Sequence, residues 1–144
     1  MTNQEILTFN EEVQIFAEYL VKTKSRNTTL NYAIDANFRR LKPVVEAIYK
    51  QVSEELKALE QKAYDTVKVE NDTRSYNELV SAGLETLTEE EQKKHKELMV
   101  EYNKWMAEEN TEFEVYKVKF EKVESAEIEL PYMGILNKIL YENN

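Results

Sequence analysis

A row of apolar residues with helical spacing constrains the fold of this chain more than any other feature. Its members follow one another at intervals of 4, 4, 3, 4, 3, 4, 4, 3 and 4 residues: Leu30, Ile34, Phe38, Leu41, Val45, Ile48, Val52, Leu56, Leu59 and Ala63. This spacing predicts a long helix over residues 28–64 whose apolar face must be covered by other helices. Because the spacing continues across Pro43, a kink or a brief break is expected there, and not two independent helices.

The remaining segments predict a mainly α-helical single domain over residues 1–144, because the chain has only two Gly and two Pro. Two pairs of residues, Thr8 with Glu11 and Thr88 with Glu91, have the spacing of a capping box and are each expected to begin a helix. The expected elements, in chain order, are a helix over 9–23, the long helix over 28–64, a turn over 65–75, helices over 75–86 and 88–110, a β segment over 112–130 and a short helix over 131–142.

The expected architecture is an antiparallel helical hairpin or bundle, in which the helices over 9–23 and 88–110 cover the long kinked helix. Apolar and charged residues alternate between Phe113 and Phe120, a period that predicts a strand in a small C-terminal β segment. A two-stranded ribbon is marginal by itself, so this segment is expected to lie on the helices or to pair between chains. A homo-oligomer is therefore expected, because both the long helix and the strand need covering.

The residue types that most catalytic sites need are scarce in this chain. There is no Cys, which excludes disulfides, thiolate catalysis and Cys-based metal sites. The only histidine, His95, stands among Lys93, Lys94 and Lys96, with no carboxylate beside it in the sequence to orient it as a triad would require. Both glycines are isolated, so no phosphate-binding loop can form. The sequence predicts a protein that is not an enzyme and has no catalytic residue, metal site or cofactor.

The overall charge and hydropathy exclude two kinds of partner. The net charge of −9 argues against binding duplex DNA, which depends on neutralising phosphates. No apolar run approaches the roughly 18 to 20 residues that span a bilayer, and the first residues lack the pattern of a signal peptide. We therefore expect a cytoplasmic protein with no membrane partner, which a basic surface of another protein could still bind.

Positive charge collects in one segment, from Lys22 to Pro43, which carries about +5. Its first group flanks the start of the long helix, which Thr28 or Thr29 is expected to cap and whose free amide groups favour anions. Its second group lies about three helical turns further on. A solvated face paired with the acidic remainder is the alternative interpretation. The candidate residues for binding an anion or a partner are Lys22, Lys24, Arg26, Arg39, Arg40 and Lys42.

Aromatic residues provide a second candidate contact. The chain has nine Tyr, and Tyr102 lies close to Trp105 on the helix over 88–110. These two rings could stack on a base or fill a pocket of a partner. Alternatively, they pack on the long helix together with Leu98, whose spacing places it on the same face.

Two stretches carry a resemblance to known proteins. The first, "FAEYLVKTKSRNTTLNYAIDANFRRLKPVVEAIYKQVSEELKALEQKAY", combines a short helix, a loop leading to a YAI-x-x-N segment and a long Glu/Lys-rich helix. It resembles the opening half of small, uncharacterised proteins encoded by bacteriophages and prophages. The second, "FEVYKVKFEKVESAEIELPYMGILNKILYE", is similar to their tails, whereas Val67 to Asn110 departs from them. The resemblance implies a phage-encoded helical protein of unknown function in the cytoplasm of a host cell, with no functional residues to transfer.

These features together predict a non-enzymatic, phage-encoded interaction protein. It is expected to bind a host or phage protein and to modulate or inhibit a component of host defence. One alternative is a sponge that holds a nucleotide or other small anion at the basic residues. Another is a protein of virion assembly or a chaperone.

Overall fold

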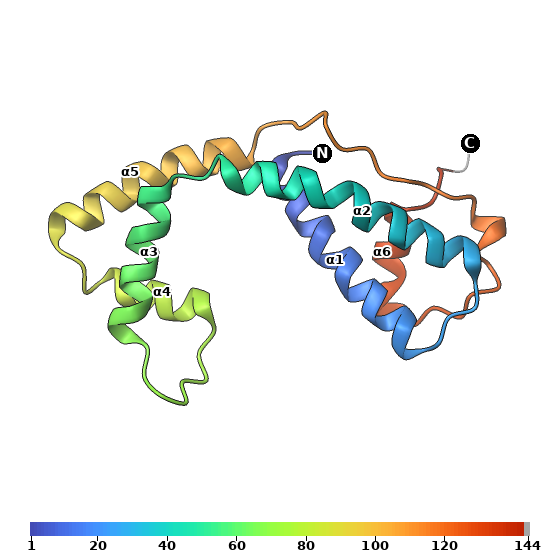
Figure 1. Cartoon of the computed structure of the whole chain (residues 1–144), viewed down its shortest axis with the longest axis horizontal. Helices are drawn as coiled ribbons and strands as arrows, with labels where there is room; N and C mark the ends of the chain where they lie inside the picture. Colours follow the sequence, from blue (N-terminus) through green and yellow to red (C-terminus); the bar gives the residue numbers. More distant parts are fainter. Residues whose placement is uncertain (143–144) are drawn as a thin grey trace. The chain divides into compact units, whose positions relative to one another are not determined.

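The chain is mainly helical and folds as two compact units (Figure 1). The computed structural model describes residues 1–142. Unit 1 comprises Met1–Tyr49 with Glu108–Asn144, and unit 2 comprises Lys50–Ala107, where the sequence predicted one domain. The helices are α1 (Asn3–Lys22), α2 (Thr28–Lys50), α3 (Glu54–Val67), α4 (Tyr76–Leu84), α5 (Glu89–Met106) and α6 (Met133–Lys138), with 3-10 turns η1 (Phe120–Lys122) and η2 (Leu130–Tyr132). The prediction of a mainly helical fold is confirmed.

The predicted helix over 28–64 is in fact two helices. α2 continues through Pro43 to Lys50, and the residues of the break, Gln51–Ser53, are not helical. α3 begins directly afterwards, because the Ser53 side chain accepts a hydrogen bond from the amide of Leu56 at 3.3 Å. The break preserves the apolar spacing, so periodicity alone does not reveal it. Its sequence signal is a serine followed by two glutamates, which suits an N-cap.

Unit 1 is built on the apolar stripe of α1. The helix begins at Asn3 and not at residue 9, because Thr2 and Glu5 form the capping box that the sequence placed at Thr8. This earlier start lengthens the buried face, which includes Ile6, Phe9, Val13, Phe16 and Leu20. α6 packs against α1 and contributes buried Ile135 and Leu136, while the rest of the predicted helix over 131–142 is η2 and irregular chain.

The predicted β segment over 112–130 contains no strand, nor do the other described residues. Val118 forms a single parallel bridge with Leu140: its amide donates to the carbonyl of Ile139 at 2.9 Å, and its carbonyl accepts from the amide of Tyr141 at 3.1 Å. The prediction of a paired strand was wrong. The alternation instead reflects an irregular segment docked on helices, with Phe113 and Val118 buried.

Asn37 of α2 holds this docked segment. Its side chain is fully buried, and its amide group pairs with the backbone of Tyr116 as a neighbouring strand would. Asn37 Oδ1 accepts from the Tyr116 amide at 2.8 Å, and Asn37 Nδ2 donates to the Tyr116 carbonyl at 3.0 Å. One side chain therefore satisfies the two backbone groups that a β ladder would otherwise have to satisfy.

In unit 2, α3 packs closely against α4 and is bridged to α5 (Figure 1). Gly83 lies inside α4 against the backbone of Ala63, and a Cβ added to it would lie only 2.8 Å from the Ala63 Cα. Gly83 is the second-last residue of α4, and its lack of a side chain lets α3 and α4 approach closely. Ion pairs join α3 to α5 in antiparallel order, Lys62 to Glu91 at 2.7 Å and, nearer the start of α3, Glu55 to Lys94 at 3.8 Å.

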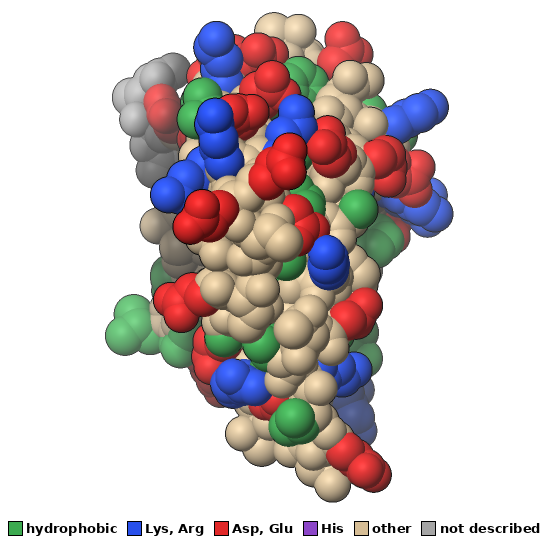
Figure 2. All heavy atoms as spheres, turned by 90° about the vertical axis from the view of Figure 1, so that its left-hand side faces the viewer, with side chains coloured by type: hydrophobic (Ala, Val, Ile, Leu, Met, Phe, Trp, Pro, Cys, Tyr) green, Lys and Arg blue, Asp and Glu red, His purple; other side chains and the backbone are tan. Residues whose placement is uncertain are grey.

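The surface of unit 2 is strongly charged with both signs mixed. On the face drawn in Figure 2, acidic and basic side chains are interspersed and the hydrophobic ones are scattered. Charged side chains also hold the loop after α3. The Arg74 Nη2 contacts an Asp72 carboxylate oxygen at 2.8 Å and the Val67 carbonyl at 3.3 Å. The Arg74 guanidinium holds the pKa of Asp72 well below its usual range.

Acid is expected to weaken unit 2 through Glu91. The capping box of Thr88 and Glu91 is confirmed at the start of α5. The bond from Lys62, followed by that from the Thr88 amide, lowers the pKa of Glu91 below its usual value of 4.5. Its contribution to stability is thus complete above that value and is lost as the pH falls through the lowered pKa. The acid-induced fall in melting temperature between pH 7 and pH 3 should be smaller in Glu91→Gln, which keeps a capping side chain.

Glu89→Gln is the matched control for this experiment. Glu89 is exposed in the same first turn of α5, so the substitution Glu89→Gln removes a similar charge from the same helix end. An equal effect of both substitutions on the acid sensitivity would contradict the role assigned to the bond between Lys62 and Glu91.

Candidate functional site

The six predicted basic residues do not converge on one place. Arg39 Nε lies 3.0 Å from Asp35, and both side chains are exposed. Arg40 Nη1 donates to the Glu114 carbonyl at 3.3 Å, and its guanidinium lies 5.2 Å from the centre of the Tyr116 ring. Arg39 thus pairs within α2, and Arg40 helps to hold the docked segment. Lys42 is exposed one turn further along α2.

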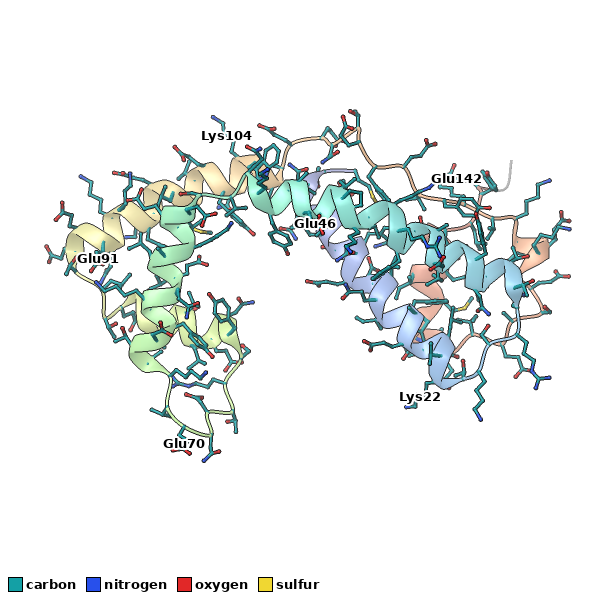
Figure 3. The ribbon with its side chains drawn as sticks, in the orientation of Figure 1. Lys22, Glu46, Glu70, Glu91, Lys104 and Glu142 are labelled. Carbon is teal, nitrogen blue, oxygen red and sulfur yellow. The ribbon has the colours of Figure 1, made fainter. Side chains whose placement is uncertain are left out.

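The other three basic residues surround a depression at the loop between α1 and α2, which we call the loop depression. Its cavity of about 790 Å³ is lined by Lys24 and Arg26 of this loop and by Glu127 and Glu129 of the C-terminal chain. Lys22 lines an adjoining cavity of about 300 Å³ that shares Glu129. Figure 3 shows Lys22 at the C-terminal end of α1. The local charges are therefore mixed, because two basic and two acidic residues line the same depression.

Two side chains fix the walls of the loop depression. The Tyr19 hydroxyl accepts from the Glu129 amide at 3.1 Å and donates to the Glu127 carbonyl at 3.4 Å. Asn27 caps α2, because its Oδ1 accepts from the Leu30 amide at 2.8 Å. Its Nδ2 donates to the Lys122 carbonyl at 3.2 Å. The predicted cap at Thr28 or Thr29 was wrong, and Asn27 both starts the helix and joins it to the C-terminal chain.

Lys24 occupies a backbone position that usually belongs to glycine. Its φ is 55°, in the left-handed region, immediately after α1. The amide of Lys24 donates to the Val21 carbonyl at 3.2 Å, and that of Ser25 donates to the Leu20 carbonyl at 2.9 Å. These two bonds form the Schellman motif that closes many helices. A side chain at this position strains the backbone, by about 1–2 kcal/mol.

Replacing Lys24 with Gly is therefore expected to stabilise unit 1. Relief of the strain exceeds the extra flexibility that glycine gives the unfolded chain, and leaves a gain of about 0.5–1 kcal/mol. Lys22→Gly removes the same charge from a helical position and is expected to destabilise by about 1 kcal/mol. Urea denaturation followed by circular dichroism would measure both variants. A stability gain from both, or from neither, would contradict the strain argument.

A second cavity, which we call the apolar groove, lies between α1 and α2. It has a volume of about 410 Å³, and its polar lining residues are Lys24, Ser25, Asn31 and Asp35. The groove is open to solvent on both walls, because Val21 is 79% exposed and Phe38 is 43% exposed. Its apolar lining residues are Ala17, Leu20, Val21, Ile34 and Phe38.

Sequence reasoning did not identify the apolar groove. Phe38 was assigned to the buried face of the long helix, but it lies at the edge of that face and remains partly exposed. The available signal was a pair of apolar spacings of four residues, Ala17 to Val21 and Ile34 to Phe38, on either side of one short loop.

One atom of the apolar groove is held unfavourably. Asn31 Nδ2 donates to the Ser25 carbonyl at 3.0 Å, whereas Asn31 Oδ1 is buried and has no hydrogen-bond partner. An unpaired buried acceptor costs about 1–3 kcal/mol. Since Lys24 is strained at the same end of the groove, two unfavourable features occur together there, as they often do where a protein binds something else.

The predicted aromatic pair lies in unit 2. Tyr102 and Trp105 are half-buried and line a cavity of about 100 Å³ next to Leu56 and Leu98. This volume is well below the roughly 300–1,000 Å³ of most small-molecule sites. On the same helix, His95 Nε2 lies 3.3 Å from a carboxylate oxygen of Glu60 on α3, so the orienting carboxylate that the sequence did not show comes from a neighbouring helix.

Across the described residues, no three or more His, Asp or Glu side chains are grouped so that they could hold a metal ion. No helix among residues 1–142 has the length and apolar character needed to cross a membrane. The chain matches no protein-family model, no curated protein and no solved structure.

Proposed function

We propose that the protein is a non-enzymatic interaction protein that binds a partner protein in the apolar groove. The observation that carries the proposal is the exposure of Val21 and Phe38 on opposite walls of a cavity lined mainly by apolar side chains. Leaving such surface in water is unfavourable by about 25 cal/mol per Å² relative to burying it. Apolar patches rimmed by polar residues mark interaction surfaces in many soluble proteins.

The partner we propose is a host or phage protein. The support is the resemblance of residues 16–64 and 113–142 to small phage-encoded proteins, together with a net charge of −9 that argues against duplex DNA as the partner. Binding would then modulate or inhibit a component of host defence. This part of the proposal rests on analogy with a group of proteins and is tested separately from the groove.

The test of the groove compares three baits in a bacterial lysate. The wild type should retain a specific protein, and a variant with Val21→Ser and Phe38→Ser should lose it. Val100→Ser is the control. Val100 is 69% exposed on α5 of unit 2, so this substitution removes an exposed apolar side chain away from the groove. Retention by all three baits, or by none, would count against the groove as the binding surface.

A second candidate function is binding of a nucleotide or another small anion at the loop depression. It is favoured by the gathering of Lys22, Lys24 and Arg26 around connected cavities. Thermal-shift measurements with a panel of nucleotides would test it. A shift should disappear in Arg26→Ala and persist in Arg39→Ala, since Arg39 pairs with Asp35 away from this depression. Persistence in both variants would exclude the loop depression.

A further inference from the structure

We infer that the segment bound in the apolar groove is an amphipathic helix that carries acidic residues toward Lys24 and Lys42. The inference rests on the proposed function, because it describes the chemistry of the partner at the same groove. It depends on three observations: the helical walls of the groove, the lack of an ion pair at Lys24 and Lys42, and the distance between these two lysines.

The walls of the groove favour a helix over an extended strand. Both walls are formed by side chains of helices, α1 and α2. The backbone groups of a helix interior are already bonded within the helix, so the walls offer no free edge to which a strand could pair. A third helix can instead place apolar side chains between Val21 and Phe38, as helices do in other helix-lined grooves.

The charges at the groove favour an acidic segment. Lys57, Lys62, Lys94 and Lys138 each form an ion pair with a glutamate. Within the part of the chain that the structure describes, Lys24 and Lys42 form none. The carboxylate that lines the groove, Asp35, is paired with Arg39 at 3.0 Å. Lys24 lines the groove, and Lys42 follows Phe38 by one turn of α2, so both can pair with carboxylates on a partner.

Their positions set the spacing of those carboxylates. Lys24 lies at the end of the groove beside Asn31, whereas Lys42 follows Phe38 by four residues and so lies on the same face of α2. Between residues 31 and 42 a helix rises about 16 Å, or about three turns. A helix lying along the groove should therefore carry acidic residues about two to three turns apart, with apolar residues between them on the face toward α1 and α2.

Selection from a displayed library of random helical peptides tests this inference. The full chain serves as one bait, and a variant with Lys24→Glu and Lys42→Glu serves as the other. Peptides selected by the wild type should be enriched in Asp and Glu beside an apolar stripe, and those selected by the variant should be enriched in Lys and Arg. A synthesised acidic peptide should bind the variant about tenfold more weakly, with a difference that shrinks as salt is added.

The outcomes separate the inference from the proposed function. Peptides that bind both baits equally, but fail to bind a Phe38→Ser bait, would leave the groove as a binding surface and overturn the acidic partner. Peptides that bind the Phe38→Ser bait as well as the wild type would overturn both. Concentration-dependent dimerisation of the chain, lost in Phe38→Ser when followed by sedimentation, would show that a second copy occupies the groove, and would also overturn the inference.

Discussion

Replacing Gly83 with Ala is expected to destabilise unit 2 by about 3 kcal/mol. The added Cβ would overlap the Ala63 carbonyl group and lie 2.8 Å from its Cα. Because the obstacle is helix backbone and not a flexible side chain, α3 and α4 would have to move apart. Urea denaturation followed by the fluorescence of Trp105, the only tryptophan, would report the loss within unit 2 itself.

Gly134 provides the control for this prediction. It lies in α6, and a Cβ added to it would meet nothing within 4 Å. Gly134→Ala should therefore raise stability by about 0.5–1 kcal/mol, because alanine favours the helix. If Gly83→Ala and Gly134→Ala changed stability in the same direction, close approach at Ala63 would not be what requires glycine in α4.

Replacing Asn37 with Ala is expected to destabilise unit 1 by about 3 kcal/mol. The substitution leaves the amide and carbonyl groups of Tyr116 without their partners in a partly buried site, and each such group costs about 1–3 kcal/mol. It also removes the bond that Asn37 Nδ2 donates to the Ala33 carbonyl at 2.8 Å. The amide exchange rates of Tyr116 and Val118 should rise more than those of other residues relative to wild type, because the docked segment would detach first.

Two further variants sharpen this prediction. Asn37→Asp keeps an acceptor for the Tyr116 amide but loses the donor and buries a charge, so it should be at least as damaging as Ala. Asn137→Ala changes an exposed asparagine on α6 and should be nearly neutral. Unchanged exchange at Tyr116 in Asn37→Ala would refute the role of Asn37 as the anchor of this segment.

Some helices were predictable from local residues, although the caps at Thr2, Asn27 and Ser53, which are equally local, were missed. The capping box of Thr88 and Glu91 lies within one turn, and the buried stripe of α1 follows from spacing alone. The break at Gln51–Ser53 was not predictable from periodicity, since the apolar phase is the same on both sides of it. The docked segment was misread as a strand, because alternation indicates burial on one side but does not say what satisfies the backbone.

The candidate site was predictable only as a set of charges. The sequence placed Arg40 in a second basic group about three turns from Arg26, but its contacts with Glu114 and Tyr116, far along the chain, could not be predicted. Likewise, no local pattern shows that Glu127 and Glu129 line the same depression as Lys24. Arg39 was the exception, because its partner Asp35 is four residues away on the same helix.

The division of the chain into two units sets an order for folding during synthesis. Unit 2 is one continuous stretch, so its three helices can pack as soon as residue 107 has left the ribosome. Unit 1 needs both ends of the chain: α1 and α2 are made first, but Asn37 has no Tyr116 to bond, and Phe9 no Phe113 to contact, until the last quarter of the chain is released. The apolar faces of α1 and α2 therefore stay exposed until the C-terminal residues are made. A partner protein can bind α1 and α2 before these residues pack on them.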